Sequence, residues 1–478
     1  MRGSLTAEDL EAFTFPSIAV VCKYCDAQGK GGRRRQAFAG IGDGSMERVH
    51  LAEMLRALTA AHGVPGAQLA VHRAGVTRHA TAGAGVREDT PFAFGSVTKT
   101  VTATVAMQLV GDGDLELDLP VVGYLPELSG SPMGGLCRIT LRHLLGHVSG
   151  LVSDHEPLAE DDGSLRRYAA AVGDAECVSA PGAVFSYSNT GYVLVGRLIE
   201  TVTGLGWWEA VQTFLSEPLG LGLTRLDDPR LAVPHLIRSG RATPVEPLLA
   251  ASWAPAGGLA GTAADLLALA LLQAGAGPED VLEPKLGDVL REAVEPVPFG
   301  LASAWGLGCA LHDGPQGRWA GHDGTLAGTT CAVRYNPLTG DAIALNTNGS
   351  NGMALWADLL TELAAQGFVV QESEQRPLED GLTPDPTPFT GDYVNGTTRF
   401  RVREVHTGDL LVEDGTGFAA TLRLHADGVF AVHHLDAEHG THYGRFLRGA
   451  HGQVECMQIS GRLARRVATA PHRMSVGA

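Results

Sequence analysis

The stretch Phe92-Ala93-Phe94-Gly95-Ser96-Val97-Thr98-Lys99 is the most informative in the chain. Apolar residues at helical spacing continue from Val97 to Leu109, which predicts a helix that begins at the serine. Ser96 and Lys99 are three residues apart, so they share a helix face and the ammonium can reach the hydroxyl. A serine hydroxyl needs an adjacent base to act as a nucleophile. Lysine can be that base only where burial and neighbouring charge lower its pKa.

Taken alone, this S-x-x-K pattern also fits a helix cap followed by a surface lysine. A second pattern, Tyr187-Ser188-Asn189, follows a Pro-Gly turn and precedes a predicted helix. A tyrosine beside a cation can take a depressed pKa and accept a proton. An asparagine two residues on can hydrogen-bond a substrate amide oxygen. The alternative is a packed loop tyrosine with a turn asparagine.

A third pattern, Gly321-His322-Asp323-Gly324-Thr325, stands between two strand-like runs. Gly324 allows the backbone to approach a ligand closely. His322 is a candidate for binding substrate or assisting proton transfer. A polar hairpin without a catalytic role fits this segment equally well.

Together, S-x-x-K, Y-x-N and H-x-G resemble the motifs of the serine β-lactamase and penicillin-binding-protein superfamily, most closely its class C branch. Residues 144–151 and 256–266 resemble two further family stretches, so the likeness covers about residues 50–365. The resemblance implies an acyl-enzyme on Ser96, with Lys99 and Tyr187 moving the proton. Substrate binding would fall to Asn189, His322, Gly324 and Thr325, with the oxyanion between the N–H groups of Ser96 and Thr325. No metal or organic cofactor is expected.

One departure affects the expected substrate. Where penicillin-binding proteins carry K-T-G, this chain has His322-Asp323-Gly324. The lysine of K-T-G helps to hold a substrate carboxylate, and histidine is neutral much of the time near pH 7. We therefore expect weak turnover of β-lactams and of D-Ala-D-Ala peptides, and better turnover of other esters or amides, with D-configured peptides favoured.

Two other functions stay open. Penicillin-binding-protein-type thioesterases, which release and cyclise nonribosomal peptides, resemble this chain in carrying a lipocalin-like tail; such an enzyme would have a peptidyl carrier protein as partner. A catalytically silent binding protein is the alternative from another class. The intact S-x-x-K, Y-x-N and H-x-G motifs argue against silence.

The predicted fold is α+β, with a β-lactamase-like antiparallel sheet sandwiched by helices, a helical subdomain and a small C-terminal β-barrel. We assign the catalytic domain to residues 46–382, a Pro-rich linker to 383–388 and the barrel domain to 389–478. Evenly spaced short strands predict the barrel, and its opening Phe389-Thr-Gly391-Asp-Tyr393 resembles a lipocalin-like domain. Residues 1–45 are interpreted as a disordered or non-native leader, with Met46 as the biological start.

The composition of the chain limits its partners and its location. The formal net charge is −17 over 478 residues, which excludes nucleic acid and anionic membrane as expected partners. An odd count of seven cysteines and the lack of a long apolar run favour a cytoplasmic protein. The histidines at 433, 434, 439 and 442 are interpreted as loop residues rather than as a metal site. A small molecule or peptide is the expected substrate.

Overall fold

The computed structural model describes residues 48–128, 138–156, 161–173, 177–373, 385–405, 409–415, 417–434 and 442–467. The predicted leader, with Met46, lies outside the described residues, as do His439 and the first two residues of the predicted linker. The domain boundaries drawn from the sequence therefore stay predictions.

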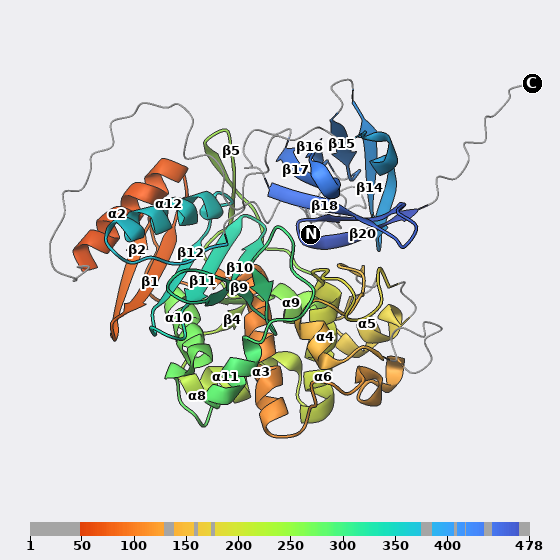
Figure 1. Cartoon of the computed structure of the whole chain (residues 1–478). Helices are drawn as coiled ribbons and strands as arrows, with labels where there is room; N and C mark the ends of the chain where they lie inside the picture. Colours follow the sequence, from red (N-terminus) through yellow and green to blue (C-terminus); the bar gives the residue numbers. More distant parts are fainter. Residues whose placement is uncertain are drawn as a thin grey trace, which may run out of the picture.

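A seven-stranded antiparallel sheet forms the centre of the larger part of the molecule, in the order β2-β1-β12-β11-β10-β9-β8 (Figure 1). Strands from both ends of this region meet in it, because β1 pairs with β12. The strands are β1 (Ala67–Arg73), β2 (Val76–Ala82), β8 (Ala304–Trp305), β9 (Ala310–His312), β10 (Trp319–Leu326), β11 (Thr329–Tyr335) and β12 (Ala342–Thr347).

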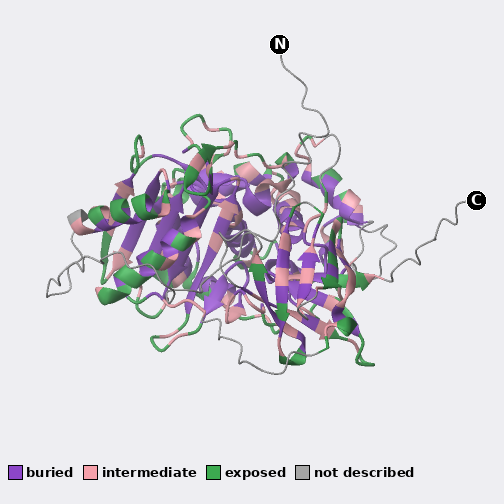
Figure 2. Ribbon diagram, turned by 90° about the horizontal axis from the view of Figure 1, so that it is seen from above, coloured by how far each residue is buried: buried purple, intermediate pink, exposed green. Residues whose placement is uncertain are grey.

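Helices cover both faces of this sheet. Alternate residues of a strand point to opposite faces, and in β1 Leu69 and Val71 join the core under α2 (Arg48–His62) and α12 (Gly352–Ala365). Ala70 joins the other core, which includes α10 (Ala263–Leu271). The purple of buried residues runs along the sheet between these layers in Figure 2. The predicted sandwich of sheet and helices is confirmed.

The second core also contains the helical subdomain, which packs around α3 (Thr98–Gly111). Every side chain of α3 from Thr98 to Leu109 is buried, so the helix has no solvent face. α3 packs against α6 (Asn189–Thr203), α7 (Trp207–Val211), α9 (Ala254–Gly257) and α11 (Pro284–Leu290). The same part of the molecule also holds α4 (Leu141–Leu145), α5 (Leu165–Val172) and α8 (Glu217–Leu219). Short strands complete this part: β3 (Phe92–Ala93), β4 (Thr224–Arg225), β5 (His235–Arg238), β6 (Arg241–Pro244) and β7 (Leu259–Gly261).

The C-terminal part is a closed, up-and-down barrel of eight strands. Aromatic side chains, among them Tyr393, Phe430 and Phe446, fill its interior. The strands are β13 (Gly391–Asn395), β14 (Thr398–Glu404), β15 (Leu410–Glu413), β16 (Ala419–Leu424), β17 (Val429–His434), β18 (His442–Arg448), β19 (Val454–Ile459) and β20 (Arg462–Val467). The barrel is confirmed, but β20 was not predicted because its three arginines hide the apolar alternation.

The structure corrects one detail of the sequence interpretation. The His322 pattern lies within a strand, β10, rather than in a hairpin between strands. Residues 305–311 are divided between β8 and β9. Leu259 belongs to β7, and Thr262 caps the following helix, α10.

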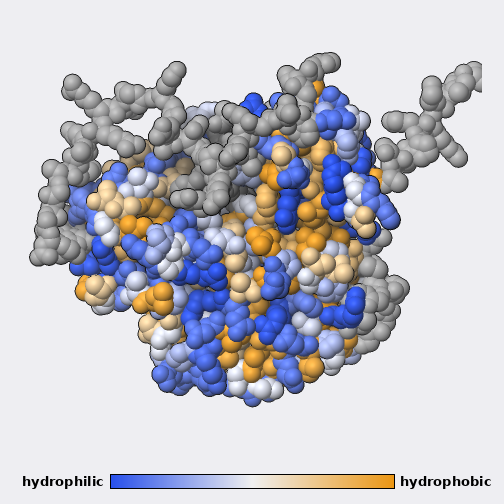
Figure 3. All heavy atoms as spheres, viewed as in Figure 1, coloured by the Kyte–Doolittle hydropathy of each residue, from blue (hydrophilic) through white to orange (hydrophobic). Residues whose placement is uncertain are grey.

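No helix in the described part of the chain is long and apolar enough to cross a membrane. The face shown in Figure 3 mixes polar and apolar side chains.

Candidate active site

Ser96 and Lys99 lie where the short helical turn Gly95–Val97 runs into α3. Lys99 Nζ donates to Ser96 Oγ at 3.1 Å and to the carbonyl oxygen of Ala256 at 2.7 Å. Ser96 is partly exposed, whereas Lys99 is fully buried. Burial, reinforced by the charge of Arg462, holds the pKa of Lys99 well below its usual value. A buried amine that is held in its unprotonated form therefore touches a hydroxyl that solvent can reach.

Two glycines allow the start of α3 to lie directly against strand β10. A Cβ on Gly324 would collide with the backbone of Phe94, and a Cβ on Gly95 would collide with that of Thr325. Gly324 thus serves a close approach of the chain to itself, a reason for glycine that the sequence did not give. The contact brings the backbones of residues 95–96 and 325 side by side, as two oxyanion donors would require.

Tyr187 lies in the loop before α6, whose N-cap is Ser188. Its ring centroid is 5.0 Å from Lys99 Nζ, and the Ser96 side chain is near enough to its phenol to lower the phenol pKa. Burial raises the pKa of Tyr187 despite the opposing effects of Ser96 and Arg462. The expectation of a depressed tyrosine pKa is therefore wrong, because desolvation outweighs the nearby cation. Tyr187 is a phenol that can pass a proton on, and Lys99 is the better acceptor.

Asn189 begins α6 and connects the loop to two residues that the sequence did not single out. Its Nδ2 donates to Asp154 Oδ1 at 2.6 Å, and Asp154 Oδ2 is paired with Arg462 Nη1 at 3.0 Å. The Arg462 guanidinium carbon lies 5.8 Å from the Tyr187 ring centroid. The C-terminal barrel thus contributes a cation beside Tyr187. Neither Asp154 nor Arg462 belongs to a motif, so only the fold reveals them.

The barrel also holds the backbone of the Tyr187 loop. Tyr187 N donates to the carbonyl oxygen of Gly461 at 2.9 Å. Gln458 Nε2 donates to the carbonyl oxygen of Phe185 at 2.7 Å. Asn395 accepts from Ser153 N at 2.7 Å and donates to Ser153 Oγ at 2.9 Å. The barrel therefore forms part of the framework of this site.

His322 points into the same cluster from β10, and its ring lies 6.2 Å from that of Tyr187. Its Nδ1 is 2.6 Å from the carbonyl oxygen of Asp323, which requires the proton on Nδ1. Burial, with the charge of Lys99, lowers the pKa of His322 to about 3. The imidazole is therefore neutral and offers Nε2 as an acceptor, so it does not replace the cation of K-T-G.

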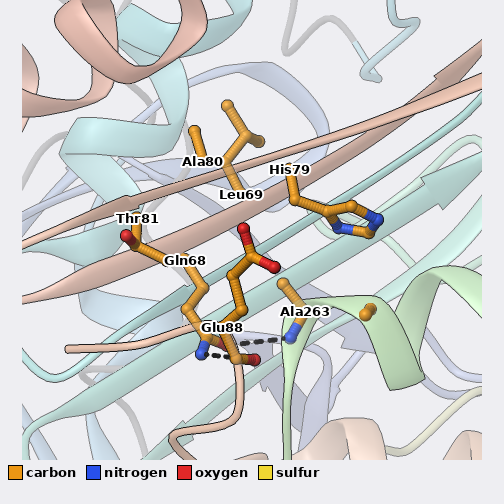
Figure 4. A pocket seen from close by; sticks show the side chains of 8 residues that line it. Gln68, Leu69, His79, Ala80, Thr81, Glu88 and Ala263 are labelled. Carbon is orange, nitrogen blue, oxygen red and sulfur yellow. Dashed lines mark hydrogen bonds between the residues drawn. The ribbon is translucent and has the colours of Figure 1, made fainter. Parts of the chain in front are cut away.

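All seven residues predicted from the sequence lie in or against this cluster. Other parts of the described chain provide weaker candidates for a functional site. No group of three or more His, Cys, Asp or Glu side chains in the described residues could hold a metal ion. Figure 4 shows a separate pocket between β1, β2 and α10, lined by Gln68, His79 and Glu88 among others. Gln68 there donates to the carbonyl oxygens of Arg87 and Thr90, which is a structural role.

The sequence of residues 51–367 matches the β-lactamase family. This chain therefore belongs to the β-lactamase family of serine hydrolases, with a barrel at its C-terminal end.

Three relatives illustrate the range of this family. Penicillin-binding protein 4 of Amycolatopsis lactamdurans is 33% identical over 378 residues, which are 73% of this chain and 97% of that protein. The crystal structure of SurE is 35% identical, with a TM-score of 0.79, and covers 88% of this chain and 99% of its own; SurE has also been crystallised with D-Leu. A D-stereospecific amidohydrolase from Streptomyces sp. is 28% identical, with a TM-score of 0.54 over 66% of this chain and 99% of its own.

Proposed function

We propose that this protein is a serine acyl-transfer enzyme that forms an acyl-enzyme on Ser96 from ester, thioester or amide substrates with a D-configured acyl residue. The observation that carries the proposal is the 3.1 Å contact between Ser96 Oγ and the buried Lys99 Nζ. A nucleophile held within hydrogen-bond reach of a base is the arrangement that covalent catalysis requires. The low pKa of Lys99 leaves its amine able to accept the proton.

The proposed reaction has two halves. Lys99 takes the hydroxyl proton while Ser96 Oγ bonds to the substrate carbonyl carbon, and the oxyanion is stabilised by the N–H groups of Ser96 and Thr325. The proton returns through Tyr187 to the leaving oxygen or nitrogen as its bond to carbon breaks. Water or an amine then attacks the acyl-enzyme by the same steps in reverse order. Asn189 and His322 orient the acyl group.

The D-configuration is supported by two of the relatives. SurE has been crystallised with D-Leu, and the Streptomyces amidohydrolase is D-stereospecific. The test uses N-acetyl-D-leucine and N-acetyl-L-leucine as thioesters of N-acetylcysteamine, with hydrolysis followed as released thiol. We expect the D-thioester to have the higher kcat/KM by about tenfold or more. Equal values, or a preference for the L-thioester, would contradict the stereochemical part of the proposal.

A second candidate is the release and cyclisation of a nonribosomal peptide. The observation that favours it is the barrel, a feature in which penicillin-binding-protein-type thioesterases resemble this chain and which here borders Tyr187 through Gly461 and Arg462. The test replaces the leucine by a short peptide thioester with a free N-terminal amine. A product lighter than the hydrolysed peptide by one water would support cyclisation, and the linear acid alone would contradict it.

A further inference from the structure

A histidine outside the three motifs lies directly against Tyr187. His147 belongs to the 144–151 stretch and is completely buried. Its backbone is left-handed, with φ +58°. Residues other than glycine rarely adopt this conformation, which costs free energy and is kept where the surroundings require it. The fold therefore places an imidazole at this point at the expense of local backbone strain.

Three contacts join His147 to the loop that carries Tyr187. The carbonyl oxygen of His147 accepts from Ser186 N at 2.8 Å. Its Nδ1 accepts from Ser188 N at 3.0 Å. Its ring stacks on that of Tyr187, with centroids 4.1 Å apart and the planes 29° from parallel. One residue thus holds both chain neighbours of Tyr187 and one face of its ring.

The contact with Ser188 also fixes the protonation state of the imidazole. A backbone N–H can only donate, so Nδ1 must carry the lone pair and the proton of neutral His147 is on Nε2. Burial lowers the pKa of His147, and the charged or basic groups that face it, Lys99, His322 and Arg462, act in the same direction. Protonation of Nδ1 would break the bond to Ser188, and the site opposes that protonation.

We infer that His147 is a positioning residue for Tyr187, which keeps the phenol oxygen where it can exchange a proton with Ser96. The inference rests on the proposed function, because it gives Tyr187 the proton relay. A displacement of about 1 Å in a reacting group can cost about a hundredfold in rate. A residue that fixes the loop on both sides of Tyr187 should therefore affect turnover although it does not contact the reacting atoms.

Two substitutions separate the contacts. His147→Asn retains an acceptor near the Nδ1 position and tolerates a left-handed backbone, but it removes the ring. His147→Phe retains a ring and removes the acceptor. Each is made alone and together with Tyr187→Phe, and kcat and KM for p-nitrophenyl butyrate are measured with Tm. His143→Asn is the matched control, since His143 caps α4 on the same segment and keeps its acceptor as asparagine.

The expected result is that each His147 variant lowers kcat by about 10- to 100-fold with KM little changed. In the Tyr187→Phe background, the same variants should lower kcat by less than about twofold further, because groups that act as one unit are not additive. Tm should fall equally in both backgrounds, since phenylalanine keeps the stacked ring. His143→Asn should leave kcat unchanged.

Independent effects that multiply in the double variants would overturn the inference, as would an unchanged kcat in His147→Asn. Should His147→Phe fail to fold, the comparison of His147→Asn alone with His147→Asn in the Tyr187→Phe background decides. An unchanged kcat in Tyr187→Phe is a different result, because it would remove the relay assigned to Tyr187 and with it the basis of the inference.

Discussion

Substitution of Arg462 is the most direct test of the electrostatics of the site, because the charge of this barrel residue lowers the pKa of Lys99. The substitution Arg462→Gln removes the charge and retains a side chain able to hydrogen-bond Asp154. Lys99 Nζ and Arg462 Cζ lie 5.0 and 5.8 Å from the same ring centroid, which places them within about 11 Å of each other. Two unit charges at about that distance interact by about 1.5 kcal/mol at an effective dielectric constant of about 20.

This energy corresponds to about one pKa unit. Arg462 lowers the pKa of Lys99 and Asp154 raises it, so loss of the arginine removes the lowering effect, leaves that of Asp154 in place and should raise the lysine pKa. The acid limb of the plot of kcat/KM against pH, which reports the free enzyme, should move up by about one unit. The substrate is p-nitrophenyl butyrate. Arg465→Gln is the matched control, since Arg465 is exposed on the same strand. An acid limb that stays in place in Arg462→Gln would refute the reasoning.

Three further outcomes are expected. Asn395→Ala leaves two buried groups of Ser153, its N–H and its Oγ, without Asn395 as partner, and should lower the free energy of unfolding by about 2–6 kcal/mol, at about 1–3 kcal/mol for each group. In guanidinium chloride unfolding, a loss no larger than that of Asn351→Ala would contradict this. The low pKa of His322 stabilises the native state fully above about pH 6.5, and the stabilisation is lost as the pH falls towards about 3. The difference in unfolding free energy between wild type and His322→Gln should therefore shrink from pH 7 to pH 4. A difference that stays constant with pH would contradict this. Benzylpenicillin should have a kcat/KM at least about tenfold below that of p-nitrophenyl butyrate, because neutral His322 cannot supply a charge-assisted bond of about 1.5–3 kcal/mol; the reverse order would show that carboxylates are bound by another group.

Much of the fold could be predicted from local patterns. Apolar residues at helical spacing from Val97 to Leu109 predicted α3, and evenly spaced short strands predicted the barrel. The failures have a physical cause. Strand β20 contains Arg462, Arg465 and Arg466, which point away from the barrel core or towards the neighbouring site, so no hydrophobic period appears. Strand β10 carries polar side chains at the site and was interpreted as a hairpin between strands.

The candidate site was predictable only where its residues are close together in the sequence. S-x-x-K can be recognised because the helix fixes the distance between its two side chains. Asn189 contacts Asp154, and Asp154 is paired with Arg462, which lies 308 positions further along the chain. This pairing depends on how the barrel docks. The direction of the tyrosine pKa also depends on burial, which no motif records.

The central claim is that Ser96 becomes acylated, and labelling by a fluorophosphonate tests it most directly. Wild type and Ser96→Ala are incubated with the probe, and each is analysed by intact mass and by mapping of the modified peptide. The account predicts one added phosphonyl group on wild type, located at Ser96, and none on Ser96→Ala. Stoichiometric labelling that persists in Ser96→Ala, or that maps to another serine of the wild type, would contradict it.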